Sequence, residues 1–162
     1  MLEARNIRKQ FPGVLALDGV CATLQSGEVL AIVGENGAGK STLMKVLAGV
    51  YQPDAGELLL DGKPITFPTS QSAVKAGVSL IHQELNLAEN LSVAANIFLG
   101  REQSTLGIIN DRAMKPHVVS ALEKVGLQAS LVDTRVSRLA PGQKQLVEIA
   151  RALAVQARAI IF

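Results

Sequence analysis

A short glycine-rich stretch stands between an apolar run and a helix-forming segment. From residue 34 to residue 41 it has the pattern G-x-x-x-x-G-K-S. Glycine accepts backbone angles that residues with a Cβ avoid, so Gly34, Gly37 and Gly39 would let successive N–H groups point toward an anion. A helix beginning near Gly39 adds its free N–H groups and the positive end of its dipole. The pattern therefore predicts a phosphate-binding loop.

The end of the pattern predicts how a nucleotide would be held. Lys40 would reach the β- and γ-phosphates, and the Ser41 hydroxyl would bind Mg²⁺. An ordinary glycine turn is the alternative, but the apolar run 29–33, expected to be a buried strand, and the apolar positions in 43–47 favour the strand–loop–helix context. The expected nucleotide-binding residues of this loop are Gly34, Glu35, Asn36, Gly37, Ala38, Gly39, Lys40, Ser41 and Thr42.

Composition narrows the class of protein. The chain has 162 residues, of which 48% are hydrophobic and 19% charged, and this balance favours a folded domain over disorder. A net charge of +2 with scattered Lys and Arg gives no basis for binding nucleic acid. No apolar run approaches the ~20 residues needed to cross a bilayer. The single cysteine, Cys21, excludes an internal disulfide, and its alternating apolar segment predicts a buried side chain. We expect a soluble, cytoplasmic domain.

The elements around the loop follow from periodicity and turn signals. Strands are expected at 2–8, about 20–24, 29–33, 57–60, 78–81 and 159–162. Helices are expected from the loop to about residue 48 and at 70–76, 92–98, 116–125 and about 142–155. Pro116 suits the first turn of a helix, so a helix that began at Asp111 should kink there. Early strands and central helices suggest an α/β core with a helical insert.

Three further features narrow the class of nucleotide-binding protein. Phe11 lies 23 positions before Gly34, behind a strand, where an aromatic ring could stack on a base. Gln83 directly follows the strand expected at 78–81. The segment 139–145, Leu-Ala-Pro-Gly-Gln-Lys-Gln, opens a helix shortly before an apolar strand.

This order of motifs resembles the ATP-binding cassette (ABC) ATPases, with an aromatic A-loop, P-loop, Q-loop, signature loop and second Walker strand. The resemblance covers essentially all of the chain. The chain is most similar to the amino-terminal cassette of a bacterial monosaccharide importer, of the type that carries two fused cassettes. The segments that carry this likeness are 11–17 (FPGVLAL), 81–85 (IHQEL), 96–102 (NIFLGRE) and 145–153 (QLVEIARAL).

The resemblance implies a role for each motif. Phe11 would pack on adenine, with a core phenylalanine as the alternative. Lys40 and Gln83 are the two catalytic candidates. Gln83 would touch Mg²⁺ or the attacking water and report the nucleotide state to a transmembrane partner. A solvated loop glutamine is the alternative. The helical segment after Gln83 would carry the contact surface for the transmembrane domain.

The signature loop departs from the family's usual Leu-Ser-Gly-Gly-Gln. Ala140 replaces the serine and Pro141 the first glycine, while Gly142 and Gln143 remain. In the family this loop caps the γ-phosphate held by the opposite cassette. Ala140 has no hydroxyl to donate there, but N–H groups at the helix N-terminus could still attract phosphate. We therefore expect nucleotide contacts from these four residues in a composite site that could be the less active of a pair.

The resemblance implies an α/β fold with a P-loop NTPase core of the ABC type and an antiparallel amino-terminal portion. The expected parts are a β-rich nucleotide-binding part at 1–83, a helical subdomain at about 84–156 and the second Walker strand at 157–162. In the family two acidic residues follow that strand, and this chain stops before them. We therefore expect a partial cassette without appreciable ATPase activity, marginally stable or self-associating because strand edges are uncovered.

The function implied is an ATP-binding subunit of a sugar importer, with ATP and Mg²⁺ as cofactors. Expected partners are transmembrane permease subunits, a periplasmic or extracellular sugar-binding protein and a second cassette, on the cytoplasmic side of the cell membrane. Alternatives are a soluble ABC protein acting on ribosomes or DNA, and a regulatory nucleotide-binding module. A P-loop kinase would explain neither Gln83 nor the segment 139–153.

Overall fold

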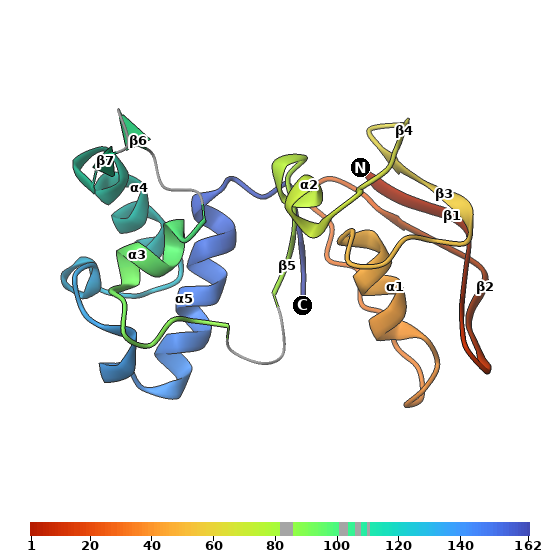
Figure 1. The fold of residues 1–162 in the computed structure, drawn as a ribbon, viewed down its shortest axis with the longest axis horizontal. Coiled ribbons are helices and arrows are strands. Elements are labelled where there is room, and N and C mark those ends of the chain that lie inside the picture. Colours follow the sequence, from red (N-terminus) through yellow and green to blue (C-terminus); the bar gives the residue numbers. More distant parts are fainter. Residues whose placement is uncertain (82–85, 101–103, 106–107, 110) are drawn as a thin grey trace. The chain divides into compact units, whose positions relative to one another are not determined.

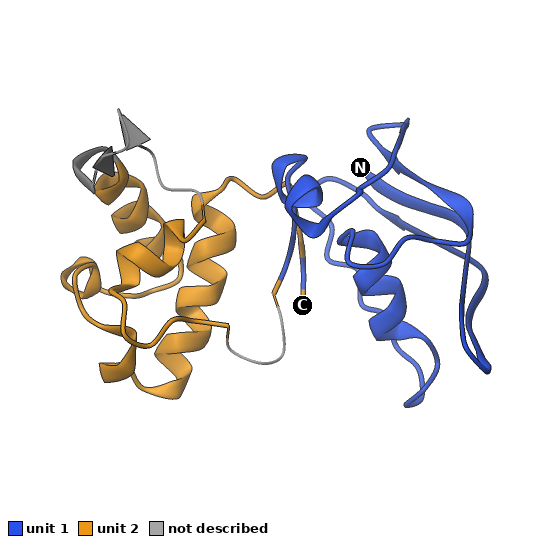
Figure 2. Ribbon diagram, viewed as in Figure 1, with its two compact units in different colours: residues 1–80, 161 blue, residues 81–160, 162 orange. Residues whose placement is uncertain are grey.

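The chain forms two compact units, and each is described by itself. The structure is a computed structural model that describes residues 1–81, 86–100, 104–105, 108–109 and 111–162. The side chains of these residues are described as well, except for those within 104–113. Unit 1 comprises residues 1–80 and Ile161, and unit 2 comprises residues 81–160 and Phe162 (Figure 2). The finer division at residue 83 that the sequence suggested stays a prediction.

Unit 1 is built on a four-stranded antiparallel sheet with the order β2-β1-β3-β4 (Figure 1). Its strands are β1 (Leu2–Phe11), β2 (Val14–Leu24), β3 (Ala55–Leu60) and β4 (Lys63–Ile65). The strands expected at 2–8, 20–24 and 57–60 are confirmed. The first two are longer than expected, because Phe11 and Val14 already pair across the turn that joins them.

Sequence analysis did not predict β4, although its turn carries a known signal. Asp61 and Gly62 join β3 to β4 with φ angles of 53° and 75°. Two successive positive φ angles are what the tight hairpin turn of type I′ requires, and Asp-Gly is a preferred pair there. A turn of this kind joins two strands, so it ends β3 and begins β4.

The expectation of a buried strand at 29–33 is wrong. This run has no regular secondary structure, and Val29 and Val33 are 96% and 91% exposed. A strand is held by hydrogen bonds to a neighbour, and none of the described strands pairs with this run. An apolar sequence sets a preference for burial but does not supply the pairing partner.

Unit 1 also contains two helices. They are α1 (Lys40–Leu47) and α2 (Ser70–Lys75). The helix α1 buries Leu43, Val46 and Leu47, and Gly49 follows its C-cap with φ 68°. Thr69 and Ser72 form a capping box at the start of α2. Both helices confirm the predicted ranges to within one or two residues.

Two short strands were predicted and are confirmed. They are β5 (Val78–Leu80) of unit 1 and β8 (Ala159–Ile161), of which only Ile161 belongs to unit 1. Val78 is buried, and β5 contacts α1 and α2 within unit 1.

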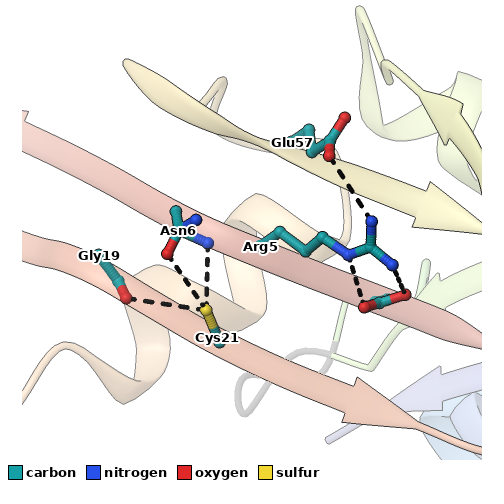
Figure 3. Close-up of polar contacts among 6 residues, drawn as sticks. Arg5, Asn6, Gly19, Cys21 and Glu57 are labelled. Atoms are coloured by element: carbon teal, nitrogen blue, oxygen red, sulfur yellow. Dashed lines mark hydrogen bonds and ion pairs between the residues drawn. The ribbon is translucent and has the colours of Figure 1, made fainter.

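Cys21 is exposed, so the expectation that it is buried is wrong. Side chains alternate along a strand, and in β2 Val20, Ala22 and Leu24 are partly buried whereas Cys21 is exposed. Figure 3 shows Cys21 beside Asn6 of β1, whose backbone N–H donates to Sγ at 3.2 Å. Asn6 has φ 50° and lies where the β1–β2 register shifts between Ala4 and Ile7.

Arg5, also drawn in Figure 3, faces acidic side chains of its own sheet. Its Nε donates to Glu3 at 2.7 Å, and its guanidinium lies 3.9 Å from the carboxylate of Glu57 on β3. The hydrogen bond and charge of Glu3, followed by the charge of Glu57, raise the pKa of Arg5. Arg5 and Glu57 are about half exposed, so the ion pair between these two side chains contributes little to stability.

Unit 2 is helical. Its α-helices are α3 (Val93–Phe98), α4 (Asp111–Lys124) and α5 (Pro141–Ala154). Its shorter elements are β6 (Ser104–Thr105), β7 (Ile108–Ile109), η1 (Ala129–Leu131) and η2 (Val136–Arg138). The predicted helices are confirmed, but α4 begins at Asp111, so Pro116 lies inside it rather than in its first turn. No helix in the described part of the chain is long and apolar enough to cross a membrane.

The core of unit 2 is one apolar cluster in which α4 and α5 pack on α3. Ile97, Val118, Leu122, Val136 and Val147 in this cluster are fully buried. Burial of their side chains supplies the main stabilising term, on the order of 1.5–3 kcal/mol for each large side chain.

Buried polar groups fix the segment that leads into α3. Asn96 is fully buried, and its amide accepts from Ala88 N at 2.7 Å and donates to the carbonyls of Ala88 and Ser92. Its polar atoms are therefore satisfied, which removes most of the cost of burying them. The Ser92 side chain accepts from Ala95 N and caps the helix.

Candidate functional site

The glycine-rich loop of unit 1 meets α1 at Gly39. This residue is the N-cap of α1 and has φ 83°. A Cβ at Gly39 would lie 2.4 Å from the carbonyl oxygen of Ala16 on β2, so only glycine fits there. Gly37 has φ 89° with open space around it. Gly34 has no positive φ, so the expectation of an unusual backbone angle at that position is wrong.

The Lys40 ammonium group lies against the loop backbone. Its Nζ donates to the carbonyls of Gly34 and Glu35, each at 2.7 Å. Ala38 N–H donates to Glu35 O at 3.2 Å and closes a turn of the loop. The loop therefore holds a fixed positive charge beside its backbone, as binding of a phosphate group requires.

The first turn of α1 is suited to an anion. No side chain caps the helix at Gly39, and its first turn contains no acidic residue. The free N–H groups and the helix dipole give this end a partial positive charge. This helix end and the Lys40 ammonium group beside the loop together fit a phosphate group.

The side chain expected to ligate Mg²⁺ at this place is a hydroxyl, that of Ser41. Ser41 is exposed at the second position of α1, whereas Thr42 is partly buried. Within the described residues, no group of three or more His, Cys, Asp or Glu could hold a metal ion by itself. A hydroxyl ligand fits a magnesium ion that is held jointly with substrate phosphates.

The Phe11 ring lies at the end of β1 and packs against one other ring. Its centroid is 5.3 Å from that of Tyr51, and the two ring planes make an angle of 70°. The Lys9 ammonium lies 5.7 Å from the Phe11 centroid. Phe11 is partly exposed, so the core-phenylalanine alternative does not describe it fully, and part of the ring remains available for stacking.

Strand β2 connects the aromatic ring to the glycine loop. Val14 pairs with Phe11, and Ala16, two residues further along β2, lies against Gly39. Two residues of an extended strand span about 7 Å. One continuous strand therefore sets the separation between the ring and the start of α1.

Asp54, which directly precedes β3, forms hydrogen bonds to the end of β1. Its carboxylate accepts from Lys9 Nζ and from Gln10 N–H, each at 2.7 Å. Its own N–H donates to Arg8 O at 2.8 Å. The hydrogen bond from Lys9, then that from Gln10 N–H, holds the pKa of the Asp54 carboxyl below its ordinary value.

The predicted signature loop forms the N-terminus of α5 in unit 2. Ala140 is the N-cap, Pro141 is the first residue of the helix, and residues 140–142 are exposed. Gln143 Oε1 accepts from Ala140 N–H at 3.0 Å, which is one half of a capping box. The other half needs a hydroxyl at the N-cap, and Ala140 has none.

Gln83 lies outside the described residues, so its predicted role stays a prediction. The described chain resumes at Asn86. Asn86 N–H donates to Glu148 Oε1 on α5 at 3.1 Å, and Lys144 of the same helix forms an ion pair with Glu89. The segment that follows Gln83 is thus attached to α5.

Sequence reasoning missed Tyr51 and Asp54 as neighbours of Phe11. Pro53, Asp54 and Gly56 are residue types that are common in turns. Aspartate is common in turns because its side chain bonds nearby backbone N–H groups, so the turn signal masked a long-range contact. Tyr51, the chain's single tyrosine, carried no periodic signal.

Comparison with known proteins gives one family and a consistent set of relatives. The model of the ABC transporter family matches residues 17–162. A putative ribose/galactose/methyl galactoside import ATP-binding protein of Pseudomonas fluorescens is 46% identical over 162 residues, which are 99% of this chain and 31% of the relative. A ribose import ATP-binding protein of Rubrobacter xylanophilus is 47% identical over 99% of this chain and 32% of its own length. The chain thus spans about a third of such relatives.

Solved structures show the same fold. A nucleotide-free ATP-binding cassette from an ABC transporter superposes with a TM-score of 0.84 at 29% identity, over 98% of this chain and 66% of that one. The ADP conformation of the cassette MJ1267 gives a TM-score of 0.81 at 29% identity, with the same coverage of both chains. The α/β cassette fold with an antiparallel amino-terminal sheet, expected from the sequence, is confirmed.

Proposed function

The chain belongs to the ABC transporter family, and we propose on this basis that it binds the triphosphate of ATP at the loop 34–42. The observation that carries the proposal is Gly39, where a positive φ and the contact with Ala16 leave room only for glycine at the start of α1. Lys40 adds a positive charge against the same loop. A nucleotide phosphate is the ligand that such a loop and helix end recognise.

Calorimetric titration of the chain with Mg-ATP tests this proposal. Lys40→Ala should weaken binding at least tenfold, because a charge-assisted contact with phosphate is worth about 1.5–3 kcal/mol. The matched control is Lys75→Ala, which removes an exposed lysine of α2 in the same unit. Equal affinities of all three proteins for ATP would contradict the proposal.

We assign the remaining nucleotide contacts in the same way. Phe11 stacks on adenine, Ser41 ligates Mg²⁺, and Lys40 and Gln83 serve hydrolysis in the complete protein. A bound magnesium ion would neutralise phosphate charge there. The exposed N-terminus of α5, with Ala140, Pro141, Gly142 and Gln143, faces phosphate on a second cassette. Its partial positive charge supports this role, which operates without a serine hydroxyl.

The complete protein is proposed to energise sugar import. The relatives named for ribose and for ribose/galactose/methyl galactoside import support a monosaccharide. The proposed partners are permease subunits, an external sugar-binding protein and a second cassette, at the cytoplasmic face of the membrane. The helical unit 2 supplies the permease contact.

A chimera tests the import function. Residues 1–162 replace the matching part of a ribose importer ATPase, and uptake of labelled ribose is measured in cells that lack the native gene. Uptake should be restored by the chimera and abolished by the same chimera with Lys40→Ala. Restoration by both proteins, or by neither one when both are expressed and membrane-associated, would contradict the proposal.

A further inference from the structure

Asp54 makes three contacts to three successive residues at the end of β1. Its backbone N–H bonds Arg8 O, and its two carboxylate oxygens bond Lys9 Nζ and Gln10 N–H. The next residue is Phe11.

The contacts of Asp54 hold β1 at the point where its pairing with β3 ends. The β1–β3 ladder reaches only to the pair Arg8–Ala55, and the β1–β2 register shifts between Lys9 and Gln10. Gln10 N–H therefore donates to a side chain on this side of the strand. Without the Asp54 carboxylate, Gln10 N–H would lose its partner on this side of the strand, while the pairing with β2 would remain.

The Asp54 carboxylate also fixes the cation beside the Phe11 ring. The Lys9 side chain is only 16% exposed, and its Nζ lies between Asp54 Oδ1 at 2.7 Å and the Phe11 centroid at 5.7 Å. A lysine held by a carboxylate has fewer accessible rotamers than a free one. The ion pair therefore keeps the cation in place against the ring.

Tyr51 supplies the second contact of the ring. Its backbone N–H donates to Lys45 O in the last turn of α1, so α1 carries Lys40 at one end and positions Tyr51 at the other. The edge-on Tyr51 and the Lys9–Asp54 pair together restrict the Phe11 ring. Base stacking needs a ring of fixed orientation.

We propose that Asp54 is a positioning residue for the nucleotide base: it fixes the end of β1 and Lys9 so that the Phe11 ring stays presented for stacking. The inference rests on the proposed function, because it assumes that Phe11 meets adenine. Asp54 itself touches neither base nor phosphate in this role. It acts only on ligands that carry a base.

Two ligands separate this role from a general effect on the loop. Mg-ATP and inorganic tripolyphosphate with Mg²⁺ are titrated calorimetrically into the chain and into Asp54→Asn. The variant should bind ATP about three- to tenfold more weakly, because only part of the contribution of base stacking is lost, and should bind tripolyphosphate as the wild type does. The control is Asp18→Asn, which removes an exposed carboxylate of β2 and should change neither affinity.

The cycle with Phe11→Ala tests whether Asp54 acts through the ring. In the Phe11→Ala background, Asp54→Asn should cause no further loss of ATP affinity. The inference would be overturned if Asp54→Asn lowered the affinities for ATP and tripolyphosphate equally, or lowered neither of them. It would also be overturned if Asp54→Asn still lowered the affinity for ATP in the Phe11→Ala background. Lys9→Met, which removes one arm of the contact, should reproduce the selective loss if Asp54→Asn does not fold.

The proposed function fails by a different result. If the wild-type chain bound neither ATP nor tripolyphosphate, or if Lys40→Ala bound both unchanged, phosphate recognition by the loop would be wrong and the Asp54 inference would fall with it. If Lys40→Ala lost both ligands while Asp54→Asn kept ATP at full affinity, only the inference would be wrong.

Discussion

Gly39 combines a positive φ with a close backbone neighbour, and its replacement should be costly for both reasons. Gly39→Ala places a Cβ 2.4 Å from Ala16 O. The left-handed angle alone costs about 1–2 kcal/mol, and overpacking adds about 1–3 kcal/mol. The matched control is Gly62→Ala, at φ 75° with nothing within 4 Å, which should cost only the first amount. Urea unfolding measures both, and equal losses would show that the contact with Ala16 is relieved without cost.

The Asp54 carboxyl should titrate below the ordinary aspartate pKa of about 3.9. Its pKa is lowered in the folded chain, chiefly by the hydrogen bond from Lys9. Because the folded pKa is lower than the unfolded one, the stabilisation is complete above the unfolded value and is lost as pH falls through the folded value. Carbon-detected NMR titration measures the pKa, and Lys9→Met should raise it. An unchanged pKa in that variant would contradict the ion pair.

Sequence reasoning reached the glycine loop because its signal is local. Gly39 and Lys40 are recognised from spacing alone, and the backbone angle of Gly39 agrees with the prediction. The neighbours of Phe11 could not be found in this way. Asp54 lies 44 residues from Gln10 in the sequence, so their hydrogen bond depends on the β1–β3 pairing that brings the turn to the strand end.

Elements with their own periodicity and end signals were predicted well. The ranges of α1, α2, α3 and α5 follow from apolar spacing and from glycine or capping residues at their ends. The run 29–33 was assigned wrongly because a strand depends on a partner outside itself. Cys21 was assigned to the wrong side of β2 because alternation gives two faces and the sequence alone does not say which one is inside.

The helix α5 should be stabilised by completing its N-terminal cap. Ala140→Ser adds a hydroxyl that can accept from the N–H of Gln143, whose side chain already accepts from Ala140 N–H. A serine at an N-cap is worth about 0.5–2 kcal/mol relative to alanine. Urea unfolding of the chain without nucleotide measures the gain, with Ala129→Ser, an exposed alanine inside η1, as the control. A gain no larger than that of the control would contradict the capping argument.

On the scale of the molecule, the chain consists of two units, and each contains some of the residues that we propose to contact nucleotide. Unit 1 contains the loop 34–42, Phe11 and Asp54, and unit 2 contains the N-terminus of α5. The apolar cluster of unit 2 includes only its own residues. Each unit therefore has buried side chains of its own that stabilise it. We expect the free energy of local opening to differ between the two units.

Hydrogen exchange tests this expectation through a core substitution in each unit. Leu122→Ala in unit 2 and Ile7→Ala in unit 1 each remove a fully buried side chain, which costs about 2–5 kcal/mol. Leu122→Ala should accelerate exchange of amides in α5 and leave those of the β1–β3 ladder close to wild type, because a local core loss lowers the opening free energy of its own unit. Ile7→Ala should do the reverse. Equal acceleration in both units for either variant would mean that the chain opens as one cooperative body.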